Sequence, residues 1–241
     1  MTPLINELGQ PVGDLVPEWS ARPLPTVSTV SGRYCRLERL ADRHAEELFV
    51  ADRRDARGES WTYLAYGPFS DKKSYAGWVK SAAQESDPLF YAIIDTDPHA
   101  DPVSAGRAVG VLSLLRVQPE AGSIEVGHVH YSPLLQRRRG GTEAQYLLMR
   151  YAFGELGYRR YEWKCDALNA LSRAAAIRLG FRYEGTFRHA LVVKGRNRDT
   201  AWYSIIDSEW PVVEARLRSW LAPENFDERA VQKAPLTRSS P

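Results

Sequence analysis

The sequence predicts an α+β domain with a mixed, mostly antiparallel central sheet and helices on both of its faces. Residues 89–95, 106–117 and 123–132 are three strand-like runs separated by brief turns. These connections are too short for crossovers, so the runs predict an antiparallel meander. A helix from about residue 134 to 156 then leads into a strand at 159–166, and this order predicts a parallel crossover.

Apolar spacing and turn residues define the elements of the first half of the chain. Residues 33–40, RYCRLERL, alternate apolar and polar side chains and predict the first strand. Residues 41–52 predict a helix, and residues 59–69, with their Gly-Pro turn, predict an aromatic loop. Residues 70–86 predict a second helix, with Ser70 as its N-cap.

The second half alternates strands and helices after the crossover. Residues 170–180 predict a helix whose Leu-Gly-Phe ending leads into a strand at 181–191. A Gly-Arg-Asn-Arg turn precedes a last strand at 199–207, and a helix at 209–221 closes the domain. We therefore expect the folded domain to span residues 32–221.

The two ends differ from this pattern. Residues 1–31 are rich in Pro, Ser and Thr and have no sustained period, so they predict an extended arm on the domain surface. Residues 222–241 are polar and predict a flexible tail. The first residues lack the basic and apolar segments of a signal peptide, and no apolar run approaches the roughly 20 residues that cross a bilayer.

Composition argues against several classes of function. The chain has 241 residues, 44% of them hydrophobic, which is enough for one domain with a core. The formal net charge is only +2, which argues against a general nucleic-acid-binding protein. Cys35 and Cys165 match no metal or disulfide pattern and predict a reduced, cytoplasmic setting without a metal. We therefore expect neither nucleic acid nor a membrane as a partner.

The segment LLQRRRGGTEAQ, which begins at residue 134, combines arginines, glycines and a helix start. The first N–H groups of a helix lack intrahelical partners, and the helix dipole favours an anion beside them. Glycine allows close approach to the backbone, and arginine adds charge-assisted contacts. Residues 137–142 are therefore a candidate diphosphate site. A solvated arginine turn before an ordinary helix is the alternative.

A second candidate lies one element later, in residues 163–181. A strand ends at Asp166, and Asn169 begins a helix with Ser172 in its first turn. Each residue also has a structural explanation, with Asn169 as a simple N-cap. Together with the diphosphate candidate, these residues predict a ligand between the ends of two parallel strands.

These motifs resemble the GNAT acyltransferase superfamily, and within it the RimJ/RimL type, whose members acetylate N-terminal amines of ribosomal proteins or other amines. The resemblance is carried by IEVGHVHYSPLLQRRRGGTEA, NALSRAAAIRLGFRYEG and DTAWYSIIDSEW, and WTYLAYGPF fits the same branch. It covers roughly residues 32–210 and implies a sheet with a splayed parallel strand pair.

The phosphate loop of this family, Gln/Arg-x-x-Gly-x-Gly/Ala, fits the chain in two registers, each with one departure. In the first, Gln136 and Gly141 match, but Arg139 replaces the central glycine. In the second, Arg137 and Gly140 match, and Thr142 takes the small position. Both registers keep the positive charge of the loop.

The resemblance implies acetyl-CoA as co-substrate. The backbone N–H groups that it places at the pyrophosphate are those around Arg138, Arg139, Gly141 and Thr142. The pantetheine arm would lie between the strands at 123–132 and 159–166, with Asn169 hydrogen-bonded to it.

Amide formation needs a deprotonated amine and a protonated leaving thiolate. Glu125 is the only carboxylate in the strand before the loop. A partly desolvated carboxylate has a raised pKa and can accept the amine proton, directly or through water. A strand glutamate paired with an arginine is the alternative. Ser172, at a helix start, is the candidate donor to the thiolate, with a solvent-facing serine as the alternative.

Other polar residues have structural explanations. His128 and His130 lie an odd number of positions from Glu125 and are expected on the opposite face of the strand. His189 is a weaker alternative base. Cys165 has no recognisable partner for acyl-enzyme chemistry and is expected to be buried.

Aromatic side chains form a candidate wall for the acceptor. The set consists of Trp61, Tyr63, Tyr66 and Phe69. Tyr203 is a further candidate that faces the ligand, and an ordinary strand aromatic is the alternative for it. A small core under a loop is the alternative explanation for the first four.

The sequence thus predicts an acetyl-CoA-dependent N-acyltransferase that acts by direct attack in a ternary complex. The expected acceptor is a primary amine, such as a protein or peptide N-terminus. The alternatives are a small-molecule amine acceptor (an antibiotic, polyamine or amino acid) or a non-catalytic acyl-CoA sensor. The resemblance also implies a homodimer as one assembly.

Overall fold

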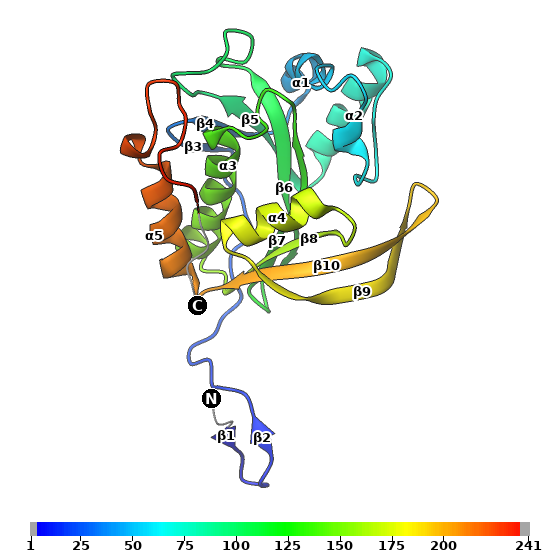
Figure 1. Ribbon diagram of the computed structural model, residues 1–241. Coiled ribbons are helices and arrows are strands. Elements are labelled where there is room, and N and C mark those ends of the chain that lie inside the picture. Colours follow the sequence, from blue (N-terminus) through cyan, green and yellow to red (C-terminus); the bar gives the residue numbers. More distant parts are fainter. Residues whose placement is uncertain (1–3, 237–241) are drawn as a thin grey trace.

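The computed structural model describes residues 4–236, and its centre is a sheet of eight strands with helices on both faces (Figure 1). The strands of this sheet are β3 (Thr29–Ser31), β4 (Cys35–Arg39), β5 (Leu89–Asp95), β6 (Ala108–Gln118), β7 (Ser123–Tyr131), β8 (Arg160–Asp166), β9 (Arg182–Val193) and β10 (Arg196–Ile206). The helices are α1 (Ala45–Asp52), α2 (Lys72–Gln84), α3 (Arg139–Arg150), α4 (Ala170–Leu179) and α5 (Trp210–Leu221).

The strand order is β3-β4-β5-β6-β7-β8-β10-β9, and β7 and β8 are the parallel pair of an otherwise antiparallel sheet. β5, β6 and β7 form the predicted meander, and α3 makes the crossover from β7 to β8. The predicted fold class is therefore confirmed. Figure 1 shows the β9–β10 ribbon extending beyond the rest of the sheet, with β9 at its outer edge.

The parallel strands β7 and β8 pair only over part of their length. Their register runs from Ser123 opposite Arg160 to Val126 opposite Trp163, and both strands continue beyond that point. The two strands therefore separate after Val126 and Trp163, as the family resemblance implies.

Apolar side chains form a separate core on each face of the sheet. α3, α4 and α5 pack on one face, and α1 and α2 pack on the other. Strand β5 contributes to both: Tyr91 and Ile93 join the first core, Phe90 and Ala92 join the second, and none of the four is more than 3% exposed. Each large buried side chain stabilises the fold by about 1.5–3 kcal/mol.

A β-bulge in β7 changes the direction of its side chains. Residues 111, 113 and 115 of β6, which share one face, lie opposite His130, Gly127 and Glu125. β7 therefore holds one extra residue, and His128 takes the positive φ of 50° within it. Glu125 and His130 thus share a face, and His128 packs on the α1–α2 core as well. The prediction that both histidines point away from Glu125 is wrong, because strict alternation stops at the bulge.

Helix ends also depart from the sequence expectation. Asp71, rather than Ser70, caps α2, because its carboxylate accepts a hydrogen bond from the Ser74 N–H at 2.8 Å. After α3 the chain continues as a π-helical turn, Tyr151–Glu155. Among the helices of residues 4–236, none combines the length and apolarity needed to cross a bilayer.

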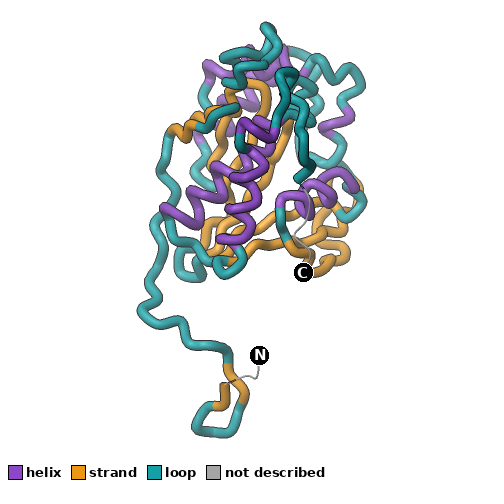
Figure 2. Tube along the Cα trace, turned by 60° about the vertical axis from the view of Figure 1, so that its left-hand side comes forward, coloured by secondary structure: helices purple, strands orange, loops and turns teal. Residues whose placement is uncertain are grey.

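The amino-terminal arm is partly ordered by the body of the protein. The Tyr151 hydroxyl accepts hydrogen bonds from the N–H groups of Thr26 and Val27, at 2.9 and 3.1 Å. Nearer the terminus, β1 (Leu4–Ile5) and β2 (Pro11–Val12) form a hairpin that projects away from the body (Figures 1 and 2).

Residues 222–236 fold back onto the body, so the expected flexible tail is wrong over this range; residues 237–241 lie outside the described part. The Asn225 side chain donates hydrogen bonds to the carbonyl oxygens of Trp220 and Ala234. Phe226 is buried and packs edge-on against Tyr34. Phe226 therefore holds residues 222–236 against the body of the protein, although the polar composition of this segment predicted a flexible tail.

Candidate functional site

The amino terminus of α3 carries exposed positive charge. Arg138 is its N-cap, and Arg137 has a positive φ of 59°, so the chain turns sharply into the helix. The side chains of Arg137 and Arg138 are exposed. Because the first N–H groups of a helix lack intrahelical partners, this end of α3 can offer backbone and side-chain donors to one anion.

Arg139 instead points into the protein. Its Nε and Nη2 donate hydrogen bonds of 2.6 Å to the two carboxylate oxygens of Asp97. The guanidinium carbon lies 4.0 Å from the ring centroid of Tyr34 and 4.8 Å from that of Phe226. The hydrogen bond with Asp97 raises the pKa of Arg139. This side chain therefore ties α3 to the β5–β6 loop and to the carboxy-terminal segment, and is not placed to contact a ligand.

Gln136 and Thr142 also hold α3 in place through their side chains. The Gln136 amide donates to the carbonyl oxygen of Tyr131 at 2.8 Å. The Thr142 hydroxyl accepts a hydrogen bond from Arg178 of α4 at 3.1 Å. These contacts link the starts of the loop and helix to β7 and to α4.

The two glycines of the loop allow close packing inside the protein. A Cβ atom on Gly141 would lie 3.0 Å from the ring of Tyr131, and one on Gly140 would lie 3.3 Å from the carbonyl oxygen of Tyr34. The Gly141 N–H donates to the Arg138 carbonyl at 3.2 Å, so this amide is used within the turn. Close packing on the sheet thus explains the glycines without a ligand.

The start of α4 lies beside the point where β7 and β8 separate. Asn169 caps the helix, because its Oδ1 accepts a hydrogen bond from the Ser172 N–H at 3.0 Å. The Ser172 hydroxyl oxygen accepts one from the indole N–H of Trp163, also at 3.0 Å, and Trp163 ends the parallel pairing. Cys165 is buried, and burial raises the pKa of its thiol.

Glu125 lies on the α1–α2 face with two cations beside it. Its side chain is 5% exposed, and its Oε2 lies 2.7 Å from Arg116 Nη1 and 2.9 Å from Lys164 Nζ. Its Oε1 lies 3.6 Å from the position that a Cβ of Gly127 would occupy, just beyond the last residue of β7 that pairs with β8. One carboxylate oxygen is thus held in ion pairs, and the other lies near Gly127, the next residue beyond the parallel pairing.

The surroundings of Glu125 include residues that the sequence analysis missed. Lys164 also pairs with Glu162 at 2.8 Å, and its Nζ lies 3.6 Å from the ring centroid of Trp202. Glu125 and Glu162 are direct neighbours across the strands, which is unfavourable for like charges unless a cation lies between them. Once the register places Glu125 opposite Glu162, a lysine or arginine is expected to face them, and Lys164 does so.

His128 lies at the bulge, where β7 leaves β8. Burial lowers the pKa of His128 to about 4, so the ring is neutral near pH 7. Its Nδ1 is 3.1 Å from the hydroxyl oxygen of Tyr66, and the two rings are stacked.

The predicted aromatic loop closes over the same face of the sheet. Trp61 stacks on His130 with ring centroids 3.7 Å apart, and it packs edge-on against Tyr66 and Phe69. Lys194, in the β9–β10 turn, donates a hydrogen bond to the carbonyl oxygen of Trp61 at 2.8 Å. The loop therefore touches the tip of the hairpin.

Two other predicted residues lie elsewhere. The Tyr63 hydroxyl donates to the carbonyl oxygen of Leu168, at the β8–α4 connection. Tyr203 belongs to the core on the α4 side, where its hydroxyl accepts a hydrogen bond from Arg173. The structure therefore does not bring Tyr203 together with the aromatic loop, and its buried position agrees with the alternative of an ordinary strand aromatic. His189 lies in the exposed β9–β10 ribbon, far along the chain from the bulge in β7.

Within residues 4–236, no cluster of His, Cys, Asp and Glu side chains is suited to hold a metal ion.

Comparison with known proteins gives a consistent result. The family model described as "Acetyltransferase (GNAT) domain" matches residues 35–182. A crystal structure of a GCN5-related N-acetyltransferase from Brucella melitensis is 44% identical, with a TM-score of 0.87, and the alignment covers 92% of this chain and 97% of that one. A probable GNAT-family acetyltransferase from Chromobacterium violaceum is 39% identical, with a TM-score of 0.74, over 84% of this chain and 98% of that one.

One curated relative matches part of the chain. The protein named "Putative ribosomal N-acetyltransferase YdaF" from Bacillus subtilis (strain 168) is 39% identical over 105 residues, which is 44% of this chain. The match spans 57% of that relative's length.

Proposed function

The chain belongs to the GNAT acetyltransferase family, and on that premise we propose that it transfers an acetyl group from acetyl-CoA to a primary amine within a ternary complex. The observation that carries this proposal is the separation of β7 and β8 after Val126 and Trp163, beside the start of α4. Separation of the two strands at this point suits a narrow, flexible chain such as pantetheine.

The residues at the two helix starts fit a diphosphate and an amide-bearing arm. Arg137 and Arg138 are exposed at the tip of α3, next to helix N–H groups. Of the other loop residues, Arg139, Gln136 and Thr142 use their side chains internally. Only their backbone groups therefore remain in the proposal, together with the amide of Asn169 at the start of α4.

Glu125 and Ser172 are the proposed acid–base residues. The Oε1 atom of Glu125 is directed toward Gly127 and can accept the amine proton, directly or through water. An indole N–H only donates, so Ser172 accepts from Trp163, and its own proton, which also neighbours the Cys165 sulfur, is the one proposed to pass to the leaving thiolate. Acetyl-CoA supplies the activated acyl group, and the new amide bond forms as the C–S bond breaks.

We infer that the acceptor is a protein or peptide N-terminus. The support is the name of the Bacillus subtilis relative, which refers to ribosomal N-acetylation. A small-molecule amine is the second candidate, and a panel of peptides and small amines distinguishes the two.

Two measurements test the proposed function. Calorimetric titration with acetyl-CoA should give a heat of binding, and a coupled assay should detect free CoA with at least one member of an amine panel. The variant Glu125→Gln should lower kcat by roughly 10²–10⁴-fold while changing acetyl-CoA affinity by less than about twofold.

Glu162→Gln is the matched control, because it removes a neighbouring carboxylate that shares Lys164. If both variants lose kcat equally, Glu125 acts through the ion-pair network and not as the base. Binding without turnover on any amine would favour a sensor instead.

A further inference from the structure

The α1–α2 face of the sheet is the side from which an acceptor can approach the proposed base. The helix starts at which the cofactor is proposed to bind belong to α3 and α4, and both helices pack on the other face. Glu125, Lys164 and the aromatic loop lie on the α1–α2 face. The charges of this face therefore influence which amines can reach Glu125.

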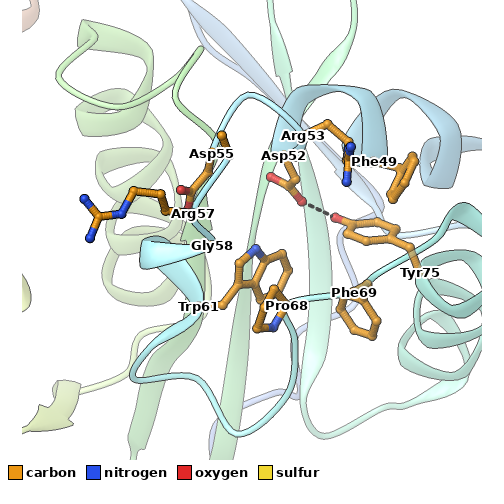
Figure 3. A pocket seen from close by; sticks show the side chains of 11 residues that line it. Phe49, Asp52, Arg53, Asp55, Arg57, Gly58, Trp61, Pro68, Phe69 and Tyr75 are labelled. Atoms are coloured by element: carbon orange, nitrogen blue, oxygen red, sulfur yellow. Dashed lines mark hydrogen bonds between the residues drawn. The ribbon is translucent and has the colours of Figure 1, made fainter.

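The aromatic loop has a fixed position on this face. Trp61 packs edge-on against Tyr75 of α2, and the Tyr75 hydroxyl donates a hydrogen bond of 2.6 Å to Asp52 Oδ2 (Figure 3). The other oxygen of Asp52 lies 3.5 Å from Nδ1 of His130, the ring on which Trp61 stacks. Asp52 and Tyr75 thus support the loop from inside and are not offered to a ligand. On its other side, the loop is held by Lys194 of the β9–β10 turn.

Arg198 of β10 lies on the same face, beyond the end of β8. Both irregularities in the β9–β10 pairing add residues to β9, so alternation continues along β10 and places Arg198, Thr200 and Trp202 on one face. Trp202 identifies that face, because its ring centroid lies 3.6 Å from Nζ of Lys164, the lysine beside the proposed base. Thr200 is opposite Asp166, the last residue of β8, so Arg198 extends past that strand.

The guanidinium of Arg198 has no partner within the described part of the protein. Among residues 4–236, no hydrogen bond or ion pair reaches it. The side chain is partly exposed, and only Nε is enclosed, so Nη1 and Nη2 are open to a ligand. Asp166, the nearest carboxylate in the strand register, accepts a hydrogen bond from the Leu168 N–H at 2.9 Å and does not pair with Arg198. A partly buried guanidinium in this state favours a carboxylate, which can accept from two of its N–H groups at once.

Arg198 adds to the positive charge around the proposed base. Glu125 is already paired with Arg116 and Lys164. Burial, with smaller contributions from Arg116 and Arg198, lowers the pKa of His128 to about 4, so this ring is neutral. The two arginines act on the bulge from β6 and from β10, and an acceptor beside Glu125 therefore meets cations on two sides.

We propose that Arg198 binds a carboxylate of the acceptor while the amine of the acceptor reaches Glu125. This inference deepens the proposed function, on which it rests. Positive charge disfavours the ammonium form of the incoming amine and so helps the deprotonation that attack requires. The same charge repels an acceptor that carries only an ammonium group, whereas a carboxylate on the acceptor compensates that repulsion. An acidic peptide and a free amino acid both supply such a carboxylate.

Binding of a carboxylate can be measured without acetyl transfer. Glutarate is titrated calorimetrically into the full chain, with glutaramide as the neutral probe of similar shape. The native protein should bind glutarate at least about tenfold more tightly than glutaramide. Arg198→Gln should lower glutarate affinity by roughly tenfold, the effect of losing hydrogen bonds to a charged group. Glutarate bound at the arginines of α3 would not respond to this substitution.

Arg196→Gln is the matched control, because it removes an exposed arginine of the same strand, two residues nearer the hairpin turn. It should bind glutarate like the native protein. Since Arg198 has no partner among the described residues, both variants should change the melting temperature by less than about 2 °C. Equal glutarate affinity in Arg198→Gln and the native protein, or an equal loss in the two variants, would overturn the inference.

Kinetics then identify the source of the carboxylate. Peptides with aspartate or asparagine at the second position are compared, as are 4-aminobutyrate and n-butylamine. A kcat/KM at least about tenfold higher for the aspartate peptide points to a protein acceptor, and the same preference for 4-aminobutyrate points to a small molecule.

Arg198→Glu should reverse the preference toward the neutral member of the pair, because it replaces the cation with a like charge. A preference that persists in Arg198→Glu, or equal kcat/KM within both pairs in the native enzyme, would contradict the assigned role. If no amine is acetylated, the proposed function fails while the glutarate titration still decides the role of Arg198.

Discussion

Replacing Arg139 with methionine is expected to destabilise the protein strongly while leaving acetyl-CoA affinity almost unchanged. Arg139 and Asp97 have side chains that are 6% and 12% exposed and are joined by two hydrogen bonds of 2.6 Å. Removing one member of a buried ion pair costs about 3–5 kcal/mol, because the other charge is left without its partner. In a chain of this size, that corresponds to a fall in Tm of roughly 6–20 °C.

Urea unfolding followed by tryptophan fluorescence measures this change, and calorimetry with acetyl-CoA measures affinity in the folded variant. Arg138→Met is the matched control, since it removes an exposed arginine one position away. It should change the free energy of unfolding by less than about 0.5 kcal/mol and should weaken acetyl-CoA binding. The double variant Asp97→Asn, Arg139→Met should recover part of the lost stability.

A loss below about 1 kcal/mol in Arg139→Met would refute the structural role of this arginine. So would a large loss of acetyl-CoA affinity in the folded Arg139→Met variant with none in Arg138→Met. Either result would return Arg139 to the ligand-binding role that the sequence suggested.

Three further predictions concern other sites. Ser172→Ala should lower kcat by about tenfold or more without lowering acetyl-CoA affinity. A thiol reagent that detects released CoA measures kcat, and an unchanged kcat would mean that Ser172 is only structural. Gly141→Ala should reduce the free energy of unfolding by about 1–3 kcal/mol in urea, because its Cβ would lie 3.0 Å from the Tyr131 ring; unchanged stability would mean that the ring moves freely. Burial raises the pKa of Asp52 to about 7, above its unfolded value, so the folded state binds more protons and native stability should fall as pH rises from about 4 to 7. Asp52→Asn should remove this part of the pH dependence, and an unchanged profile would count against the raised pKa.

The order of the elements could be predicted because short-range patterns determine it. The apolar runs of β5, β6 and β7 and the short turns between them define a meander without tertiary information. The presence of a helix after the arginines could also be predicted, although it begins at Arg139 and not near residue 134. These features depend on residues that are close in sequence.

The direction of individual side chains could not be predicted in the same way. His130 shares a face with Glu125 only because a bulge adds one residue to β7, and no composition signal marks that bulge. Arg139 points inward because Asp97, in a loop far along the chain, provides a buried partner. The direction of these side chains depends on contacts between segments far apart in the sequence. Rules of apolar and polar alternation carry no information about such contacts.

The ion pairs of Lys164 with Glu125 and Glu162, and the contact between Asp52 and His130, could not be predicted from the sequence for a related reason. Lys164 belongs to the site because β7 and β8 pair in parallel with Glu125 opposite Glu162. Asp52 meets His130 only when α1 packs on the sheet. Both required the register of distant segments.

The outer edge of the sheet also has a consequence for contacts with other molecules. β9 is twelve residues long, and an open strand of that length would ordinarily recruit other chains by backbone pairing. Its pairing with β10 is interrupted twice, with His189 at a positive φ of 50° in one interruption and arginines at 182 and 188 along the strand. These interruptions and charges oppose regular backbone pairing along the edge, whereas the exposed side chains of Tyr183, Phe187, Leu191 and Val192 favour contact with another apolar surface.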